Sequence, residues 1–177
     1  MRRTLQRYFY TYVYKSKQST MSHRANLHDK VGQVNATFPN VRRMTPSNVR
    51  ALQEPFVFVD CRSKEERDVS KIDVHALSIE EFEEQLDDIV DRDVIIICHC
   101  TVGIRSARFV SKHQDRVEKI YTMPGGILSW IDEGYSIYLG TENNEGPPSP
   151  RETRRVHPCL KEFVSLAPEG YECVFTV

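Results

Sequence analysis

The run Val94-Ile95-Ile96-Ile97 constrains the fold more than any other segment of the chain. Four consecutive apolar, β-branched residues predict a strand that is buried on both faces, as at the centre of a parallel sheet. Short apolar runs alternate with helix-like segments over residues 38–140. This alternation is typical of an α/β fold, in which a mostly parallel central sheet is flanked by helices on both faces.

Local signals place the other elements of this span. Thr45 followed by Pro46 predicts a short helix to about residue 53, because the hydroxyl can cap a helix that begins at the proline. Ser78 and Glu81 form a capping box, which predicts a helix to about Val90. We further expect a fully buried strand at 56–59, a strand at 119–122, and helices at 107–113 and 127–133, with Gly134 directly after the second helix.

The chain of 177 residues suits one globular domain with extensions. We assign residues 1–37 to a basic N-terminal extension, 38–140 to the domain, and 141–177 to a linker and C-terminal extension. Asn, Gly and Pro between residues 143 and 150 indicate the linker. The apolar stretches 160–167 and 171–177 are compatible with a helix and strand packed on the domain, or with a mobile tail.

Charge and composition narrow the possible partners and location. Lys and Arg total 24 against 25 Asp and Glu, so we expect no nucleic-acid partner, and no apolar stretch is long enough to predict a membrane span. The first 28 residues carry six Lys or Arg and no acid before Asp29. Such a segment predicts a mitochondrial transit peptide. The alternative is a basic tail on a cytoplasmic protein, with Met21 as the true start.

Cys100 lies where a ligand is expected in such a fold, between the central strand and the next helix. The backbone N–H groups of the connecting loop can point at the cysteine sulfur, and Gly103 permits the tight curl that this requires. Together with the helix N-terminus and Arg105, they favour the nucleophilic thiolate. The same groups would stabilise a negatively charged persulfide without a side-chain acid or base.

Three motifs that follow one another along the chain resemble those of a known family. Cys-x-x-Gly-x-Arg-Ser spans residues 100–106, Asp60-Cys61-Arg62 precedes it, and Gly125-Gly126 followed by Trp130 comes after it. The set resembles the rhodanese family, and implies a single rhodanese-like domain with thiosulfate sulfurtransferase-like activity. Cys100 would carry a persulfide, and no metal or organic cofactor would be needed. The residues that would bind donor and persulfide are Thr101, Val102, Gly103, Ile104, Arg105 and Ser106.

The resemblance also implies the partners, which are a small sulfur donor and a thiol acceptor such as glutathione or a protein thiol, or cyanide. Thiosulfate-using relatives often carry more polar groups in this loop, whereas Val102 and Ile104 are apolar here. These two residues favour a sulfur carrier with another partner over a thiosulfate:cyanide enzyme.

Two other functions compete with sulfur transfer. The fold could serve as a non-catalytic module that binds an acidic or phosphorylated segment. Cysteine-dependent phosphatases of the same fold place five residues between Cys and Arg, but only four separate Cys100 from Arg105. The tighter loop suits one sulfur atom and favours sulfur transfer over phosphate hydrolysis.

The remaining candidate residues have structural interpretations. Asp60 and Arg62 predict an ion pair that orders the neighbouring loop. Cys61 and Cys98 are typical of small buried side chains, and Cys98-His99-Cys100 is a poor metal site because alternate strand residues face opposite sides. Trp130 is expected in the core. Either Cys159 or Cys173 could resolve an oxidised Cys100, although unpaired cysteines of a tail are more often incidental.

Overall fold

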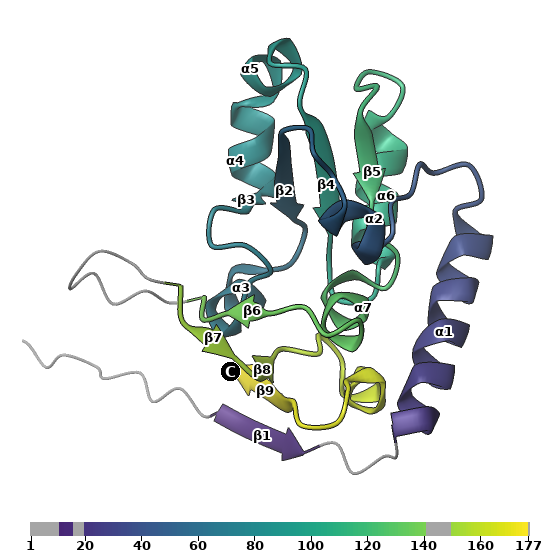
Figure 1. Cartoon of the computed structure of the whole chain (residues 1–177), viewed down its shortest axis with the longest axis vertical. Helices are drawn as coiled ribbons and strands as arrows, with labels where there is room; N and C mark the ends of the chain where they lie inside the picture. The colour runs from purple at the N-terminus through teal and green to yellow at the C-terminus, as the bar shows by residue number, and fades with distance from the viewer. Residues whose placement is uncertain (1–10, 16–19, 141–149, 177) are drawn as a thin grey trace, which may run out of the picture.

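A computed structural model describes residues 11–15, 20–140 and 150–176 of the chain (Figure 1). Its central sheet is parallel and has the strand order β3-β2-β4-β5. The four strands are β2 (Phe56–Asp60), β3 (Leu77–Ser78), β4 (Ile95–His99) and β5 (Ile120–Thr122). The predicted α/β fold is therefore confirmed, with the apolar run as the fully buried inner strand β4.

Alternate residues of β4 enter two separate hydrophobic cores, one on each face of the sheet. Ile95 and Ile97 belong to a core with Leu27 of α1 (Thr20–Thr37), Val49 of α2 (Pro46–Arg50) and α7 (Gly126–Asp132). The core on the other face contains Ile96 and Cys98. Its helices are α4 (Ile79–Glu84), α5 (Leu86–Asp91) and α6 (Ile104–His113).

The helix caps predicted at Thr45 and Ser78 are confirmed, whereas the helix predicted over 107–113 begins earlier, at Ile104. Another predicted helix is interrupted. Thr45 caps α2 by accepting a hydrogen bond from the Asn48 N–H, and the capping box of Ser78 and Glu81 opens α4. The expected single helix to Val90 is wrong, because Gln85 is non-helical (φ −104°, ψ 8°) and separates α4 from α5. Phe82 before the break and Leu86 after it are both buried.

Residues 150–176 form an ordered unit, which we call the C-terminal cap. It contains β7 (Glu152–Thr153), β8 (Arg155–Val156), the 3₁₀ helix η1 (Lys161–Leu166) and β9 (Glu172–Thr176). β7 pairs with β6 (Ile137–Tyr138), and β9 pairs with β8 and with β1 (Thr11–Lys15). Figure 1 shows the cap, in yellow and yellow-green, beyond the carboxyl ends of β2, β4 and β5. Because Val156, Phe163 and Cys173 join the core of Ile97, the packed alternative is the one observed.

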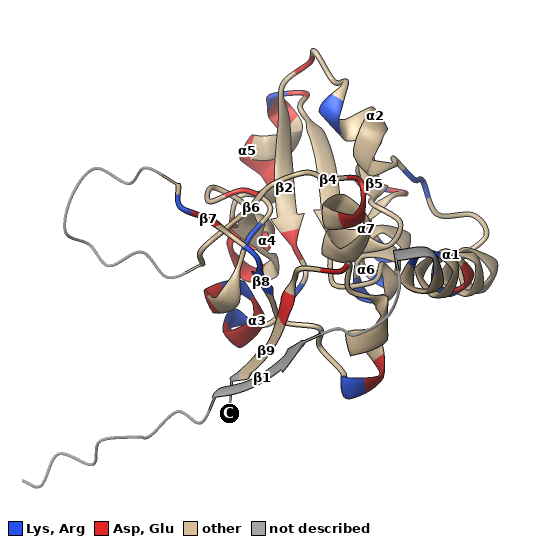
Figure 2. Ribbon diagram, turned by 60° about the horizontal axis from the view of Figure 1, so that its bottom comes forward, with Lys and Arg blue, Asp and Glu red and all other residues tan. Residues whose placement is uncertain are grey.

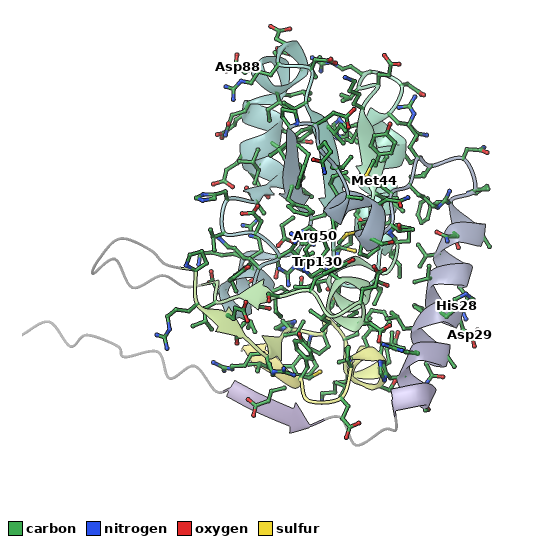
Figure 3. The ribbon with its side chains drawn as sticks, in the orientation of Figure 1. His28, Asp29, Met44, Arg50, Asp88 and Trp130 are labelled. Carbon is green, nitrogen blue, oxygen red and sulfur yellow. The ribbon has the colours of Figure 1, made fainter. Side chains whose placement is uncertain are left out.

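Helix α1 lies against the domain, although all of it falls in the segment 1–37 that was assigned to the basic N-terminal extension. It contacts α7 and η1, and the Nε2 atom of buried His23 lies 2.7 Å from Oδ1 of Asp132. His28 and Asp29, by contrast, are exposed on its outer side (Figure 3). The predicted linker over 141–149 and the segments 1–10 and 16–19 lie outside the described residues. Across the part that is described, no helix has the length and apolar character needed to cross a membrane.

Candidate active site

Cys100 directly follows β4, and its thiol is enclosed by the loop that leads into α6. The Gly103 N–H donates a hydrogen bond to the sulfur at 3.2 Å, and the Ser106 hydroxyl lies 3.8 Å from it. Gly103 has φ 95° and caps α6, as predicted from the need for a tight curl. Cys100 exposes only 1% of its surface, so the sulfur is a buried group at a helix N-terminus.

The segment that begins with Gly125-Gly126 packs against this loop and donates hydrogen bonds to its backbone. The Ile127 N–H donates to the Cys100 carbonyl at 2.8 Å, and the Leu128 N–H donates to the Thr101 carbonyl at 3.3 Å. A Cβ atom on Gly126 would lie 2.1 Å from the Cys100 carbonyl oxygen, and Gly126 has φ 54°. The motif therefore needs glycine both for its backbone conformation and for its close approach to Cys100.

Arg105 does not point freely at the sulfur, because Glu66 binds it from the neighbouring helix α3 (Lys64–Val69). Its Nη1 and Nη2 atoms donate to the two carboxylate oxygens at 2.5 and 2.8 Å, and the Thr101 hydroxyl donates to the same carboxylate at 2.8 Å. Burial acts to raise the pKa of Glu66, but the hydrogen bonds and charge of Arg105 lower it to about 2. Glu66 is therefore ionised at neutral pH and offsets the positive charge of Arg105.

Glu66 is a site residue that the sequence analysis missed, although a local signal was present. Ser63 and Glu66 form a capping box at the start of α3, of the same kind as the one recognised at Ser78. One carboxylate thus caps its own helix and binds Arg105. Figure 2 shows acidic and basic residues side by side on α3, so no single-sign patch singles Glu66 out.

Asp60 and Arg62 form the predicted ion pair, fully buried at the carboxyl end of β2. The guanidinium donates to both carboxylate oxygens, at 2.9 and 2.7 Å, and also to the Ser70 carbonyl at 2.7 Å. Burial acts to raise the pKa of Asp60, but Arg62 and His99 hold it far below its usual range. This pair orders the segment before β3 rather than reaching the sulfur of Cys100.

The neighbouring His99 side chain is also completely buried. Its Nε2 lies 3.7 Å from Oδ2 of Asp60, and its ring packs edge-to-face on Phe58 at 5.9 Å between centroids. Burial lowers the pKa of His99 to about 4, against the opposing effect of Asp60. The imidazole is consequently neutral at pH 7.

The other predicted residues are members of the loop after Cys100 and two buried cysteines outside it. Thr101 and Val102 are buried, and Ile104 is half-buried at the start of α6. Cys61 and Cys98 are buried as expected, and the pKa of Cys61 is raised well above its usual value by its hydrogen bond with Cys98 and by burial. Among the described residues, no group of three or more His, Cys, Asp and Glu is arranged to bind a metal ion.

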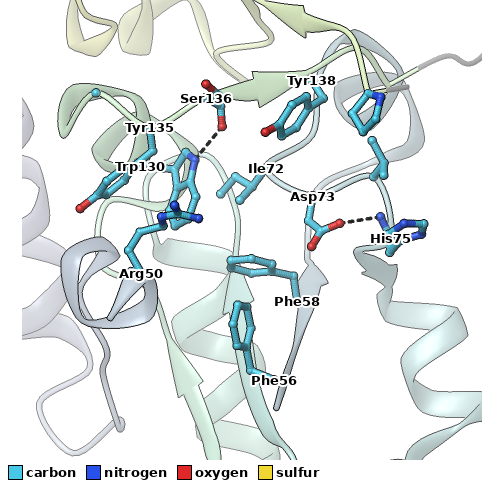
Figure 4. A pocket seen from close by; sticks show the side chains of 13 residues that line it. Arg50, Phe56, Phe58, Ile72, Asp73, His75, Trp130, Tyr135, Ser136 and Tyr138 are labelled. Atoms are coloured by element: carbon cyan, nitrogen blue, oxygen red, sulfur yellow. Dashed lines mark hydrogen bonds between the residues drawn. The ribbon is translucent and has the colours of Figure 1, made fainter. Parts of the chain in front are cut away.

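A separate pocket of about 500 Å³ lies between α2, β2, α7 and β6 (Figure 4). Trp130 closes it from the core side, where it is 5% exposed and donates from Nε1 to the Ser136 carbonyl at 2.9 Å. Phe56, at 39% exposure, and the stacked pair of Arg50 and Tyr135 form further walls. The expectation that β2 is buried throughout is therefore wrong at Phe56. None of the described residues that line this pocket belongs to the loop 100–106, so it is distinct from the Cys100 site.

A family model described as the rhodanese-like domain matches residues 45–133, half of the chain and all three sequence motifs. The chain belongs to the rhodanese-like domain family. No curated protein sequence matches this rhodanese-like chain.

One solved structure shares the fold, and two others are similar to this chain. A thiosulfate sulfurtransferase from Pseudomonas aeruginosa is 18% identical with a TM-score of 0.53, over 70% of this chain and 25% of that one. A rhodanese-related protein from Thermoplasma volcanium is 27% identical with a TM-score of 0.48, over 55% of this chain and 98% of that one. The polysulfide-sulfur transferase from Wolinella succinogenes is 20% identical with a TM-score of 0.48, over 73% and 100%.

Proposed function

We propose that this rhodanese-like protein is a sulfurtransferase that carries a sulfane sulfur as a persulfide on Cys100. The supporting observation is the thiol itself, which lies at the N-terminus of α6 and accepts a hydrogen bond from the Gly103 N–H at 3.2 Å. An amide and a helix N-terminus both favour negative charge on sulfur. The amide and the helix N-terminus stabilise the negative charge of the attacking thiolate and also that of the persulfide that forms.

The reaction needs two displacements at sulfur. The Cys100 thiolate attacks the sulfane sulfur of the donor, a new S–S bond forms on Cys100, and the donor fragment leaves with the electrons of the broken bond. With thiosulfate that fragment is sulfite, and with a persulfide or polysulfide it is a thiolate or a shortened polysulfide. An acceptor thiolate then attacks the outer sulfur, and the electrons of that S–S bond return to Cys100.

The donor that fits best is a persulfide or polysulfide rather than thiosulfate. Thiosulfate carries two negative charges, and the one cation of the loop, Arg105, is already paired with Glu66. The side chains of Val102 and Ile104 offer no replacement charge. A donor whose transferable sulfur lies in an apolar, less highly charged chain loses less hydration at this site.

Phosphate ester hydrolysis fits this arrangement poorly. A phosphate dianion in a cysteine loop needs a guanidinium that is free to bind it. Arg105 is held by both oxygens of Glu66, and only four residues separate it from Cys100. We expect no Cys100-dependent turnover of an aryl phosphate.

The proposal is tested by intact mass after incubation with a polysulfide and, separately, with thiosulfate. Wild type should gain one sulfur atom that cyanide removes, and Cys100→Ala should gain none. Cys98→Ala is the matched control, because Cys98 lies two residues earlier, in β4, and is equally buried; it should label like wild type. Equal labelling of Cys100→Ala would refute the proposal. No labelling of wild type by any donor would favour the binding module.

We also propose mitochondrial delivery, on the basis of the basic, acid-free N-terminal segment. Deleting residues 1–28 would confuse this test, because it removes β1 and the His23 contact of α1 with Asp132. Replacing Arg2, Arg3 and Arg7 by Gln leaves both elements intact. A tagged triple variant should shift from mitochondria to cytosol, and a cytosolic wild type would refute the proposal.

A further inference from the structure

The pocket between α2, β2, α7 and β6 has an aromatic wall that the proposed sulfur transfer does not use (Figure 4). Phe56 meets Phe58 edge-to-face at 5.4 Å between ring centroids, and Phe58 meets Trp130 in the same way at 5.7 Å. Trp130 in turn lies 4.9 Å from Tyr135. Such a wall offers π surface to a ligand that is itself aromatic. The volume of about 500 Å³ lies within the usual range for small-molecule sites.

Phe56 extends this wall beyond the hydrophobic core. The large apolar side chains that the structure describes as exposed are those of Phe56, Val90 and Leu160, and Phe56 is the aromatic one among them. Phe58, two residues later on the same face of β2, is only 5% exposed and belongs to the core. The strand thus presents a second ring outside the core, where it can cover one side of a bound ring.

Arg50 gives the pocket a positive charge that no carboxylate neutralises. Its guanidinium lies 5.6 Å from the centre of the Tyr135 ring, and it forms no ion pair with any residue that the structure describes. Aromatic walls also suit organic cations, but this guanidinium would repel a second cation. An anionic group can instead accept two parallel hydrogen bonds from the guanidinium. The pocket therefore favours an aromatic anion.

Asp73 provides the second polar group that orients a ligand. Figure 4 shows Arg50 and Asp73 on opposite sides of the pocket, with Phe58 and Ile72 between them. Oδ1 of Asp73 accepts a hydrogen bond from the His75 N–H at 2.8 Å, whereas Oδ2 has no partner within the described part of the chain. Oδ2 can accept from an N–H or O–H of a ligand. An anion is attracted at one end of the pocket and repelled at the other, so the two ends select opposite ends of the ligand.

We propose that this pocket binds a small aromatic anion, in which a flat ring is joined to a phosphate or a carboxylate. The ring lies against Phe56, Phe58 and Trp130, the anionic group binds Arg50, and an N–H or O–H on the ring donates to Asp73. A mononucleotide and an aromatic carboxylic acid both have this chemistry. Binding in this pocket needs no sulfur on the active-site cysteine.

The test uses Trp130, because it is the single tryptophan of the chain and lines the pocket. In a proton–nitrogen correlation spectrum of the full-length protein, its indole N–H, which donates to the Ser136 carbonyl, gives one side-chain peak. AMP and para-hydroxyphenylacetate are titrated separately as the two kinds of aromatic anion. Ribose phosphate lacks the aromatic ring, and adenosine and tyrosol lack the anionic group. At least one aromatic anion should shift the peak saturably, at a half-saturating concentration at least about tenfold below those of its incomplete analogues.

Two variants test the residues that carry the proposal. Arg50→Gln removes the cation and Phe56→Ala removes the exposed ring, and each should raise the half-saturating concentration about tenfold or more. Both side chains are exposed, so the fold should persist. Arg92→Gln and Leu160→Ala are the matched controls, because they remove an exposed arginine and an exposed apolar side chain that do not line the pocket. The controls should bind like wild type.

The two arms of the titration distinguish the sources of the ligand. Binding of AMP alone would assign the site to nucleotides, binding of para-hydroxyphenylacetate alone would assign it to aromatic acids, and either result supports the proposal, as does binding of both. A saturable shift with neither compound would overturn it. Equal affinity for the incomplete analogues, or unchanged affinity in Arg50→Gln and Phe56→Ala, would overturn it as well. Because no sulfur donor is added, none of these results depends on persulfide formation at Cys100.

Discussion

Glu66 and Arg105 lie 39 positions apart and are joined by two hydrogen bonds of 2.5 and 2.8 Å across the loop that holds Cys100. The carboxylate comes from α3, which follows β2, and the guanidinium comes from α6, which follows β4. The pair therefore ties together the two helices that begin at the carboxyl ends of neighbouring parallel strands. It fixes the first turn of α6, and with it the Gly103 N–H that faces the sulfur.

Glu66→Gln should destabilise the fold by about 3 kcal/mol at pH 7, because the pKa of Glu66 is about 2 in the fold against an ordinary 4.5. A carboxyl with a lowered pKa stabilises the fold above its unfolded-state pKa and loses that contribution as pH falls. The difference from wild type should thus be constant above about pH 5 and shrink toward pH 2. Urea unfolding at several pH values measures it.

Glu65→Gln is the control for this pH series, since Glu65 is exposed on the same helix turn. It should leave the free energy of unfolding close to that of wild type. A pH-independent deficit in Glu66→Gln, or an equal deficit in Glu65→Gln, would contradict the ion-pair explanation.

Asp60→Asn should cost about 3–5 kcal/mol, because it leaves the buried guanidinium of Arg62 without its charge partner. The comparison is Asp68→Asn, which breaks an ion pair with Lys64 on the surface of α3, where the lysine side chain is 73% exposed. That change should cost no more than about 0.5 kcal/mol. Chemical denaturation measures the free energy of unfolding of both variants. Similar decreases in the two would show that burial of the ion pair does not determine how much it stabilises the fold.

The sequence predicted the elements whose signals are local. Four apolar residues in a row identified the inner strand β4, and the capping box at Ser78 located the start of α4. The loop after β4 was predicted because strand, glycine and helix start follow one another directly. Gly103 was the residue expected to permit the tight curl, and it has a positive φ.

What the sequence could not show were contacts between segments far apart in the chain. The capping box identifies Glu66 as a helix cap but gives no sign of its hydrogen bonds to Arg105, because exposed carboxylates also cap helices. The packing of the C-terminal cap was equally unpredictable, since Val156 lies in a strand of two residues, too short to carry a clear period. The break at Gln85 was not predicted either, because no proline or glycine marks it.

His99 should make the fold lose stability as pH falls from about 6.5 to about 4. Its pKa is lowered to about 4 by burial, so in this range the unfolded chain binds a proton that the folded chain does not. The expected loss is about 3 kcal/mol in total. His99→Phe, which keeps a ring against Phe58, should flatten the stability curve between pH 6.5 and 4.5, above the range where Glu66 titrates. A loss of stability in His99→Phe as steep as that of wild type over this pH range would be the contrary result.

Gly126→Ala should abolish persulfide formation, because its Cβ would lie 2.1 Å from the Cys100 carbonyl oxygen and push the loop away from the sulfur. Gly134→Ala is the control, because it introduces the backbone strain of a positive φ without the steric clash. Gly134 also has a positive φ, 84°, but a Cβ there would meet no atom within 4 Å, so that variant should lose only about 1 kcal/mol and still load sulfur. Intact mass after polysulfide treatment and thermal unfolding of both variants provide the measurement. If Gly126→Ala loads sulfur as Gly134→Ala does, the close approach of the glycine motif to Cys100 has no part in shaping the site.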